Sequence, residues 1–192
     1  MTRYDFLVLL HVTAVIVWLG AGTTMDLLFL RAERLREPLE LKRAGDMMEW
    51  LVPRVFIPSA ISTLVLGVFA GWDGPWSFGD LWILIGLVGW AANFFTGLLF
   101  IKPQAEKMPQ IVAEYGPTSP QAQRQGKLLA VVSRIQLLAL FLVVADMVIK
   151  PTGDDEGVLI VGAAILVAAI VAGVLVMRRS DFTEAPAAAE PR

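Results

Sequence analysis

The chain has 192 residues, of which 56% are hydrophobic and only 18% are charged, and its mean hydropathy is +0.65. This balance is far more apolar than that of ordinary soluble domains. The formal net charge of −2 is too small to predict binding to nucleic acid or another polyanion. With no cysteine and one histidine, the sequence excludes disulfides, thiolate metal sites, iron–sulfur clusters and multi-histidine metal centres.

Five apolar stretches fill most of the chain, and each is about as long as a bilayer is thick. A helix rises about 1.5 Å per residue and the hydrocarbon core is about 30 Å thick, so about 20 apolar residues cross it. The sequence therefore predicts an all-α fold: a polytopic transmembrane helical bundle in residues 1–179, with four core helices plus a fifth C-terminal helix. The expected helices are residues 6–25, 51–70, 81–100, 128–149 and 158–177, followed by a disordered cytoplasmic tail at 180–192.

The first stretch is expected to stay in the protein as a helix. Arg3 is offset by Asp5, and the apolar run is longer than the hydrophobic region of a usual signal peptide. His11, Trp18 and Met25 recur every seven residues and therefore share one face of this helix. Two glycines nearby allow close approach by a neighbouring helix, the commoner arrangement, or by a flat cofactor; they are Gly20 and Gly22.

Basic residues gather in alternate connections, and this asymmetry orients the bundle. They are concentrated between helices one and two, between helices three and four, and after helix five. By the positive-inside rule these segments face the cytoplasm, which places the N-terminus outside and the C-terminus inside, most simply in a bacterial cytoplasmic membrane. The residues concerned are Arg31, Arg34, Arg36, Lys42, Arg43, Lys102, Lys107, Arg124, Lys127, Arg178, Arg179 and Arg192.

Ionisable side chains inside a membrane are costly, so they are commonly paired or functional. Asp26 and Arg54 are both expected near the inner boundary, and an ion pair tying helices one and two together is the simplest interpretation. Asp146 is expected in the outer leaflet near the depth of His11, where its carboxylate would fix the imidazole tautomer. Arg134 is expected about 9 Å in from the inner boundary, where it can bind a propionate, a phosphate or a lipid headgroup, or snorkel to the interface.

The connections and uncharged polar residues complete the expected architecture. Residues 71–80 form a short outer turn that makes helices two and three a hairpin, and residues 102–127 carry four prolines that predict an irregular segment with at most short helices. Helix five has no polar side chain and is expected at the periphery, packed through Ala169 and Gly173. Side chains suited to an interfacial belt are Trp72, Trp76, Phe78 and Trp82, and those suited to interhelical hydrogen bonds are Ser59, Ser62, Thr63, Asn93 and Thr96.

Several stretches together resemble a known family. FLVLLHVTAVIVWLGAGTTMDLLFLRAER, with an early His11, then Trp18-x-Gly20 and a basic exit, resembles the first helix of a bacterial superfamily. That superfamily includes the copper-resistance protein D domain and the HemJ-type protoporphyrinogen oxidases. EWLVPRVFIPSAISTLVLGVFAG, GPWSFGDLWILIGLVGWAANFFTGLLFIKP and DMVIKP are similar to one branch, the predicted integral membrane family called domain of unknown function 2269. The resemblance covers about residues 4–151.

The resemblance implies a cofactor. In HemJ-like relatives a helix-one histidine is regarded as a ligand of b-type haem, which implies this role for His11, beside Trp18. A thioether such as Met147 or an open site would lie opposite, and Arg134 is a candidate propionate partner. Those relatives also carry a further histidine after helix one and a lysine entering helix three. Here the matching residues are Arg31-Ala32-Glu33 and Gly79-Asp80-Leu81, and this departure argues against the oxidase activity.

Three functional hypotheses follow. The first is a non-enzymatic integral membrane protein of unassigned role, whose intramembrane polar residues His11, Asp26, Arg54 and Asp146 mainly hold the bundle together. The second is a haem-b-dependent redox protein with His11 as axial ligand. The third is a copper or small-solute permease, which is weaker because soft Cu(I) ligands are few and polar residues gather at the two interfaces. The lipid bilayer is the expected partner, and the sequence leaves open whether copies associate as a homo-oligomer.

Overall fold

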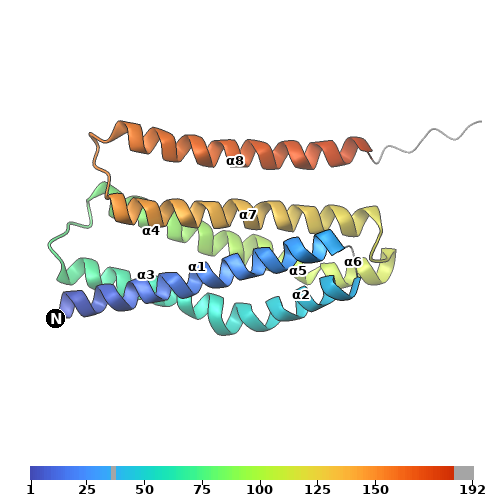
Figure 1. Cartoon of the computed structure of the whole chain (residues 1–192), viewed down its shortest axis with the longest axis horizontal. Helices are drawn as coiled ribbons and strands as arrows, with labels where there is room; N and C mark the ends of the chain where they lie inside the picture. The colour runs from blue at the N-terminus through green and yellow to red at the C-terminus, as the bar shows by residue number, and fades with distance from the viewer. Residues whose placement is uncertain (36–37, 184–192) are drawn as a thin grey trace, which may run out of the picture.

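The computed structural model describes residues 1–35 and 38–183, and every regular element in them is helical (Figure 1). Five of its helical segments are long and apolar enough to cross a membrane, which confirms the all-α, polytopic fold. The elements are α1 (Arg3–Leu35), α2 (Pro38–Leu51), η1 (Val52–Phe56), α3 (Ile57–Asp73), α4 (Leu81–Thr96), η2 (Gly97–Ile101), α5 (Lys102–Glu106), α6 (Met108–Tyr115), α7 (Pro120–Ile149) and α8 (Glu156–Thr183).

The helices run further than the apolar stretches that predict them. α1 continues to Leu35 and α7 begins at Pro120, because the flanking segments are rich in Arg, Glu, Gln and Leu, which are good helix formers in water. Ser119 caps α7 by accepting a hydrogen bond from the Ala122 N–H at 3.2 Å. α8 includes residues 180–183, which the sequence assigns to the tail. The rest of that predicted tail, residues 184–192, lies outside the described residues, as do residues 36–37 between α1 and α2.

The segment 102–119 is more regular than its prolines suggest. Pro103 and Pro109 occupy the first turns of α5 and α6, where a missing N–H costs no hydrogen bond, so short helices form between them. Two π-helical turns interrupt the second and third spans: η1 joins α2 to α3, and η2 joins α4 to α5. In η1 the ring of Pro53 removes one N–H from the helical ladder, and the Ile57 N–H reaches back to the Val52 carbonyl.

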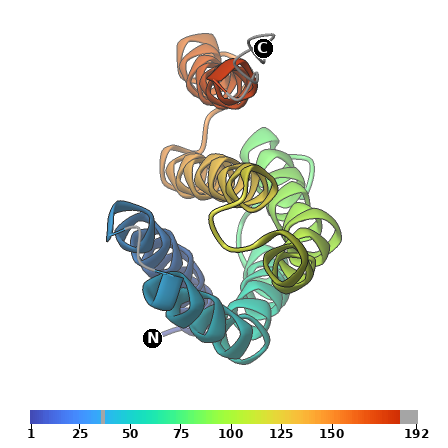
Figure 2. The same ribbon diagram turned by 90° about the vertical axis from the view of Figure 1, so that its right-hand side faces the viewer.

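Four long helices form a ring, which Figure 2 shows end-on. α1 packs against α3 and α7, and α4 packs against α7 and α3. Among the described elements, α8 contacts α7 alone, outside the ring. The predicted arrangement of four core helices plus a fifth peripheral helix is therefore confirmed.

The middle of the ring is filled by large apolar side chains. Trp18, Ala60 and Leu140 are its most buried members, and they come from α1, α3 and α7. Trp90 of α4 packs against them and donates a hydrogen bond from its indole N–H to the Ala60 carbonyl at 2.9 Å. Each of the four ring helices thus contributes to one central cluster.

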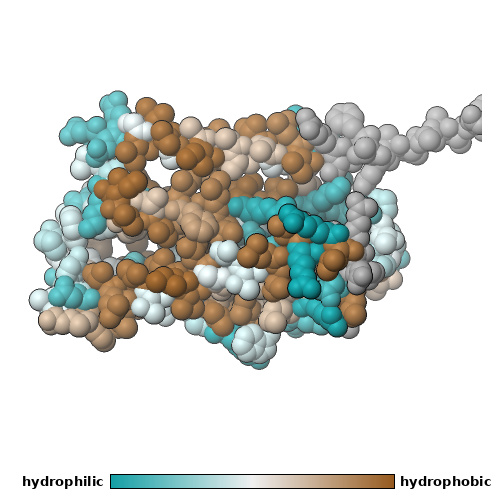
Figure 3. Space-filling view, in the orientation of Figure 1, coloured by the Kyte–Doolittle hydropathy of each residue, from teal (hydrophilic) through white to brown (hydrophobic). Residues whose placement is uncertain are grey.

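The outer surface is apolar, as a lipid-facing surface must be. Figure 3 shows hydrophobic residues over most of the length of the bundle, with hydrophilic residues gathered towards its ends. α8 lies along α7, where the predicted small residue Gly173 is buried: a Cβ there would be 2.7 Å from a methyl of Val131 and 3.0 Å from one of Ile135. These features agree with a multi-pass protein in a bilayer.

Candidate functional site

The imidazole of His11 is held against α3. Its Nδ1–H donates a hydrogen bond to the carbonyl oxygen of Thr63 at 2.8 Å. The ring lies over Gly67, where a Cβ would be 2.8 Å from the imidazole Cε1, so only glycine leaves room for this contact. Because Nδ1 carries the proton of this hydrogen bond, the neutral ring keeps its lone pair on Nε2.

Two further polar groups on the same pair of helices have no partner. The indole N–H of Trp18 and the hydroxyl of Thr63 are buried and make no hydrogen bond within the described residues. The side chain of Trp18 is only 1% exposed. Leaving such a group unpaired in an apolar medium costs a few kcal/mol, roughly, so each of these two groups calls for an explanation.

Among the described residues, Asp146 is the one side chain with two buried polar atoms that lack a partner. It is 8% exposed, and neither carboxylate oxygen has a hydrogen-bond partner among the described residues. Asp146 is six residues from Leu140 on α7, and His11 is seven residues from Trp18 on α1. Because Leu140 and Trp18 both belong to the central cluster, Asp146 and His11 each lie about 10 Å from it along their helices, which agrees with the predicted common depth.

The face that Asp146 occupies argues against the expected partnership with His11. Leu137 of α7 faces α1, because its Cδ1 would be 3.6 Å from a Cβ on Gly22. Nine residues separate Leu137 from Asp146, and this spacing turns the carboxylate about 180° away from that side of α7. The two groups share a level, and no hydrogen bond joins them.

Met147 packs against α4. A Cβ at Gly86 would overlap its methyl group, so the thioether fills the space that this glycine leaves. One turn earlier, Val143 fills the space at Gly89 in the same way. Met147 therefore serves the contact between α4 and α7, which sequence reasoning did not assign to it.

The remaining predicted residues lie towards the other end. The Arg54 guanidinium donates to the Trp50 carbonyl at 3.3 Å and lies 5.4 Å from the centre of the Trp50 ring. Asp26 is half-buried on α1, and its predicted ion pair with Arg54 stays a prediction, which a double-mutant cycle would test. Arg134 is exposed on α7, about 20 Å from Met147 along the helix axis.

Sequence reasoning missed two sets of contacts. Asn93 and Gln136 exchange hydrogen bonds, each side-chain amide donating to the other residue's main-chain carbonyl at 2.8 Å. Gln136 is an evident polar residue within the fourth apolar stretch, so its presence was readable. Its partner was not, because the sequence does not disclose which helices are neighbours.

The second missed set ties together the end of the bundle that holds the N-terminus. The Lys150 ammonium lies 4.0 Å from the centre of the Trp76 ring and 5.3 Å from that of Trp82. The Trp76 indole N–H donates to the Tyr4 hydroxyl at 3.1 Å. Beyond this cluster, hydrogen bonds from the N–H and hydroxyl of Thr152 lower the pKa of Asp155, at the turn that starts α8. The expected belt tryptophans thus also bind a cation of the chain itself.

Comparison with known proteins gives one match. Residues 5–151 match the family model described as predicted integral membrane protein (DUF2269). The match covers the ring helices and ends just after α7, so α8 follows it. No curated protein and no solved structure matches the chain.

Proposed function

The chain belongs to the DUF2269 family of predicted integral membrane proteins, and we propose that it binds b-type haem as a membrane redox protein, with His11 Nε2 as the iron ligand. The observation that carries the proposal is the 2.8 Å hydrogen bond from His11 Nδ1–H to the Thr63 carbonyl. Metal-ligating histidines nearly always donate their other ring N–H to a carbonyl or carboxylate, which fixes the tautomer and the ring orientation. The choice of haem as the cofactor comes from the resemblance to HemJ-like proteins.

One unpaired donor beside His11 is compatible with this cofactor. The Thr63 hydroxyl lacks an acceptor, and the propionates of a b-type haem are acceptors. The unpaired Trp18 indole N–H lies about 10 Å further along α1, in the central cluster. The central cluster fills the middle of the ring, so a cofactor on His11 belongs to the outer half of the bundle. Met147 and Arg134 fit less well, since the first is used in packing against Gly86 and the second is exposed in the other half.

In this proposal the cofactor, the Thr63 carbonyl and the ring helices have separate roles. When bound, haem supplies one-electron chemistry. The Thr63 carbonyl orients His11 and raises its basicity as a ligand. The apolar ring helices keep water from the site. The same proposal places the N-terminus outside and the C-terminus in the cytoplasm of a bacterial membrane, on the distribution of basic residues.

A structural role for the membrane-buried polar residues is the alternative. Two links favour it: the hydrogen bond from Trp90 to Ala60, and the hydrogen bonds between Asn93 and Gln136. Each joins two helices through side-chain donors and main-chain acceptors alone, with no cofactor. On this alternative the bond from His11 to Thr63 is one more link between helices. No specific observation favours a copper or small-solute permease.

An absorption spectrum separates the two. The protein is purified in mild detergent after expression with ample haem, and spectra are taken oxidised and after dithionite. We expect one haem per chain, a Soret band with reduced α and β bands, and loss of both in His11→Ala. Thr13→Ala, an exposed substitution on the same helix, is the matched control and should keep the spectrum. A colourless but folded protein would overturn the haem proposal and leave the structural role.

A further inference from the structure

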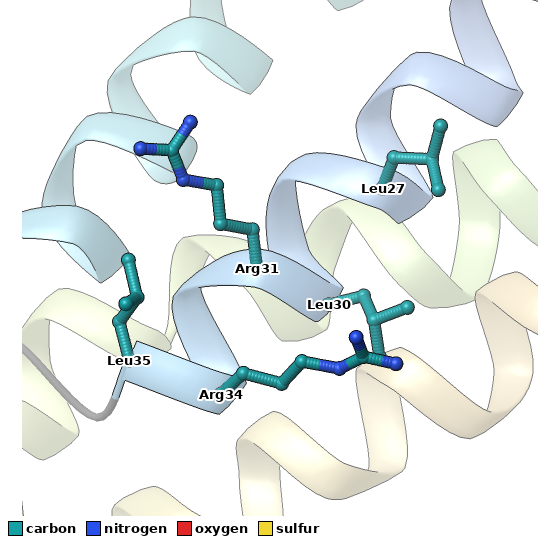
Figure 4. A pocket seen from close by; sticks show the side chains of 5 residues that line it. All are labelled: Leu27, Leu30, Arg31, Arg34 and Leu35. Atoms are coloured by element: carbon teal, nitrogen blue, oxygen red, sulfur yellow. The ribbon is translucent and has the colours of Figure 1, made fainter.

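The last two turns of α1 carry a stripe of alternating character. Five residues spaced three and four apart share one face of the helix and line a hollow of about 300 Å³. Figure 4 shows their side chains projecting from successive turns, with the Arg31 and Arg34 side chains extended in different directions from the helix. We call this surface the α1 groove; its residues are Leu27, Leu30, Arg31, Arg34 and Leu35.

The α1 groove lies at the boundary of the membrane. The expected apolar stretch of α1 ends at residue 25, so Leu27 and Leu30 stand at the inner edge of the hydrocarbon region, and Arg31 and Arg34 follow at headgroup level. Leu27 is 60% exposed, which leaves it in contact with lipid. An apolar lower half and a cationic upper half follow the profile of a phospholipid, with chains below and phosphate above.

The two arginines carry charge that the described part of the chain does not neutralise. Neither Arg31 nor Arg34 makes a salt bridge or side-chain hydrogen bond there. On α2, the carboxylate of Glu40 is paired with Arg43 at 2.6 Å. A guanidinium has five N–H donors and matches a phosphate with two parallel hydrogen bonds, better than a lysine ammonium does.

We propose that the α1 groove binds one anionic phospholipid, with the exposed side chains of Arg31 and Arg34 turning towards its phosphate and the start of an acyl chain along Leu27 and Leu30. The charge selects an anionic headgroup over a zwitterionic one, and the leucines select a lipid over free phosphate. Basic clusters at the end of a membrane helix attract anionic lipid in proportion to the number of charges. The site is independent of His11 and of any cofactor.

The test measures lipid selectivity of the intact protein. Native mass spectrometry from mixed micelles should retain phosphatidylglycerol in preference to phosphatidylcholine, and phosphatidylglycerol nanodiscs should raise the thermal midpoint more than phosphatidylcholine nanodiscs. In Arg31→Gln/Arg34→Gln we expect the preference to fall roughly tenfold or more. The matched control, Lys102→Gln/Lys107→Gln, removes two exposed charges outside the groove and should keep the preference.

Three results would overturn the proposal. Equal loss in both double variants would show general surface charge. Equal retention of both lipids by the natural chain would show no headgroup selection. Full competition by inorganic phosphate would show an anion site without a lipid. If the double variant does not fold, the single variants Arg31→Gln and Arg34→Gln, measured beside the natural chain, decide the same question.

Discussion

Single glycines set how closely α4 and α7 approach. At Gly86 the hydrogen atom of glycine leaves the space that the Met147 methyl fills, and a Cβ would overlap that methyl. Methionine is flexible, so its side chain can move aside. Helices in a membrane associate largely through close packing, however, and lipid tails fill a loosened interface less well than the matching helix does.

We expect Gly86→Ala to destabilise the protein by about 1–3 kcal/mol, the usual cost of overpacking a well-filled core. The thermal midpoint in detergent measures it. Gly162→Ala on α8 is the control, because nothing lies within 4 Å of a Cβ there, and alanine is the better helix former. Equal midpoints for the two variants would contradict the account of the interface.

Residue roles were predictable only in part. The sequence identifies His11 as a candidate because it is the one histidine and lies in an apolar helix. The sequence does not identify its partner, because every residue has a main-chain carbonyl and nothing distinguishes that of Thr63. The depth of Asp146 followed from helical rise alone. Its direction around α7 needed the packing of Leu137 against α1, which is information about neighbours.

Between elements, polar side chains supply the links that apolar helices lack. The exchanged hydrogen bonds of Asn93 and Gln136 fix α4 against α7 near the middle of the membrane. In lipid the unpaired alternative is costly, although such bonds measure only about 0.5–2 kcal/mol each.

We therefore expect Asn93→Ala and Gln136→Ala each to lower stability by about 1 kcal/mol. Unfolding in mixed micelles with increasing denaturing detergent gives the free energies. Gln121→Ala, an exposed position on the same α7, should have no effect beyond error. If Gln121→Ala lowered the free energy of unfolding as much as Gln136→Ala, any loss of glutamine would weaken α7. The hydrogen bonds between Asn93 and Gln136 would then have no special role.

Helix existence was the most predictable property at this scale, and helix ends were the least. Five stretches long enough to cross a bilayer identify five helices, because lipid leaves the backbone no other way to satisfy its hydrogen bonds. Their ends lie in water, where polar helix formers continue α1 and α7 well past the hydrocarbon. A hydropathy profile does not predict that continuation, because the residues that extend these helices are polar.

For the whole molecule, the distribution of lysine and arginine predicts the orientation in the membrane. The natural chain has no cysteine, so a single introduced thiol reports one position without background. A membrane-impermeant maleimide should label Ser77→Cys, in the α3–α4 connection, in intact cells. It should label Glu114→Cys, on α6, only after the membrane is permeabilised. The reverse pattern would invert the topology, and labelling of both in intact cells would rule out a single orientation.

The ring order was beyond sequence reasoning, since five similar apolar helices can be arranged in many ways. The peripheral place of α8 was the exception. A span without polar side chains cannot form hydrogen bonds with other helices in the bundle interior, so it was expected at the periphery. Its place outside the ring also fits the end of the family match at residue 151.

The pairing of the helices bears on how the chain is made. α1 lies beside α3, α4 lies beside α7, and the two pairs meet around Trp18, Ala60 and Leu140. The first pair is complete once the ribosome has passed Asp73, before any of α4 exists. Membrane helices insert first and associate by packing afterwards. The α1–α3 pair is therefore synthesised before the α4–α7 pair, and α8 is synthesised after both.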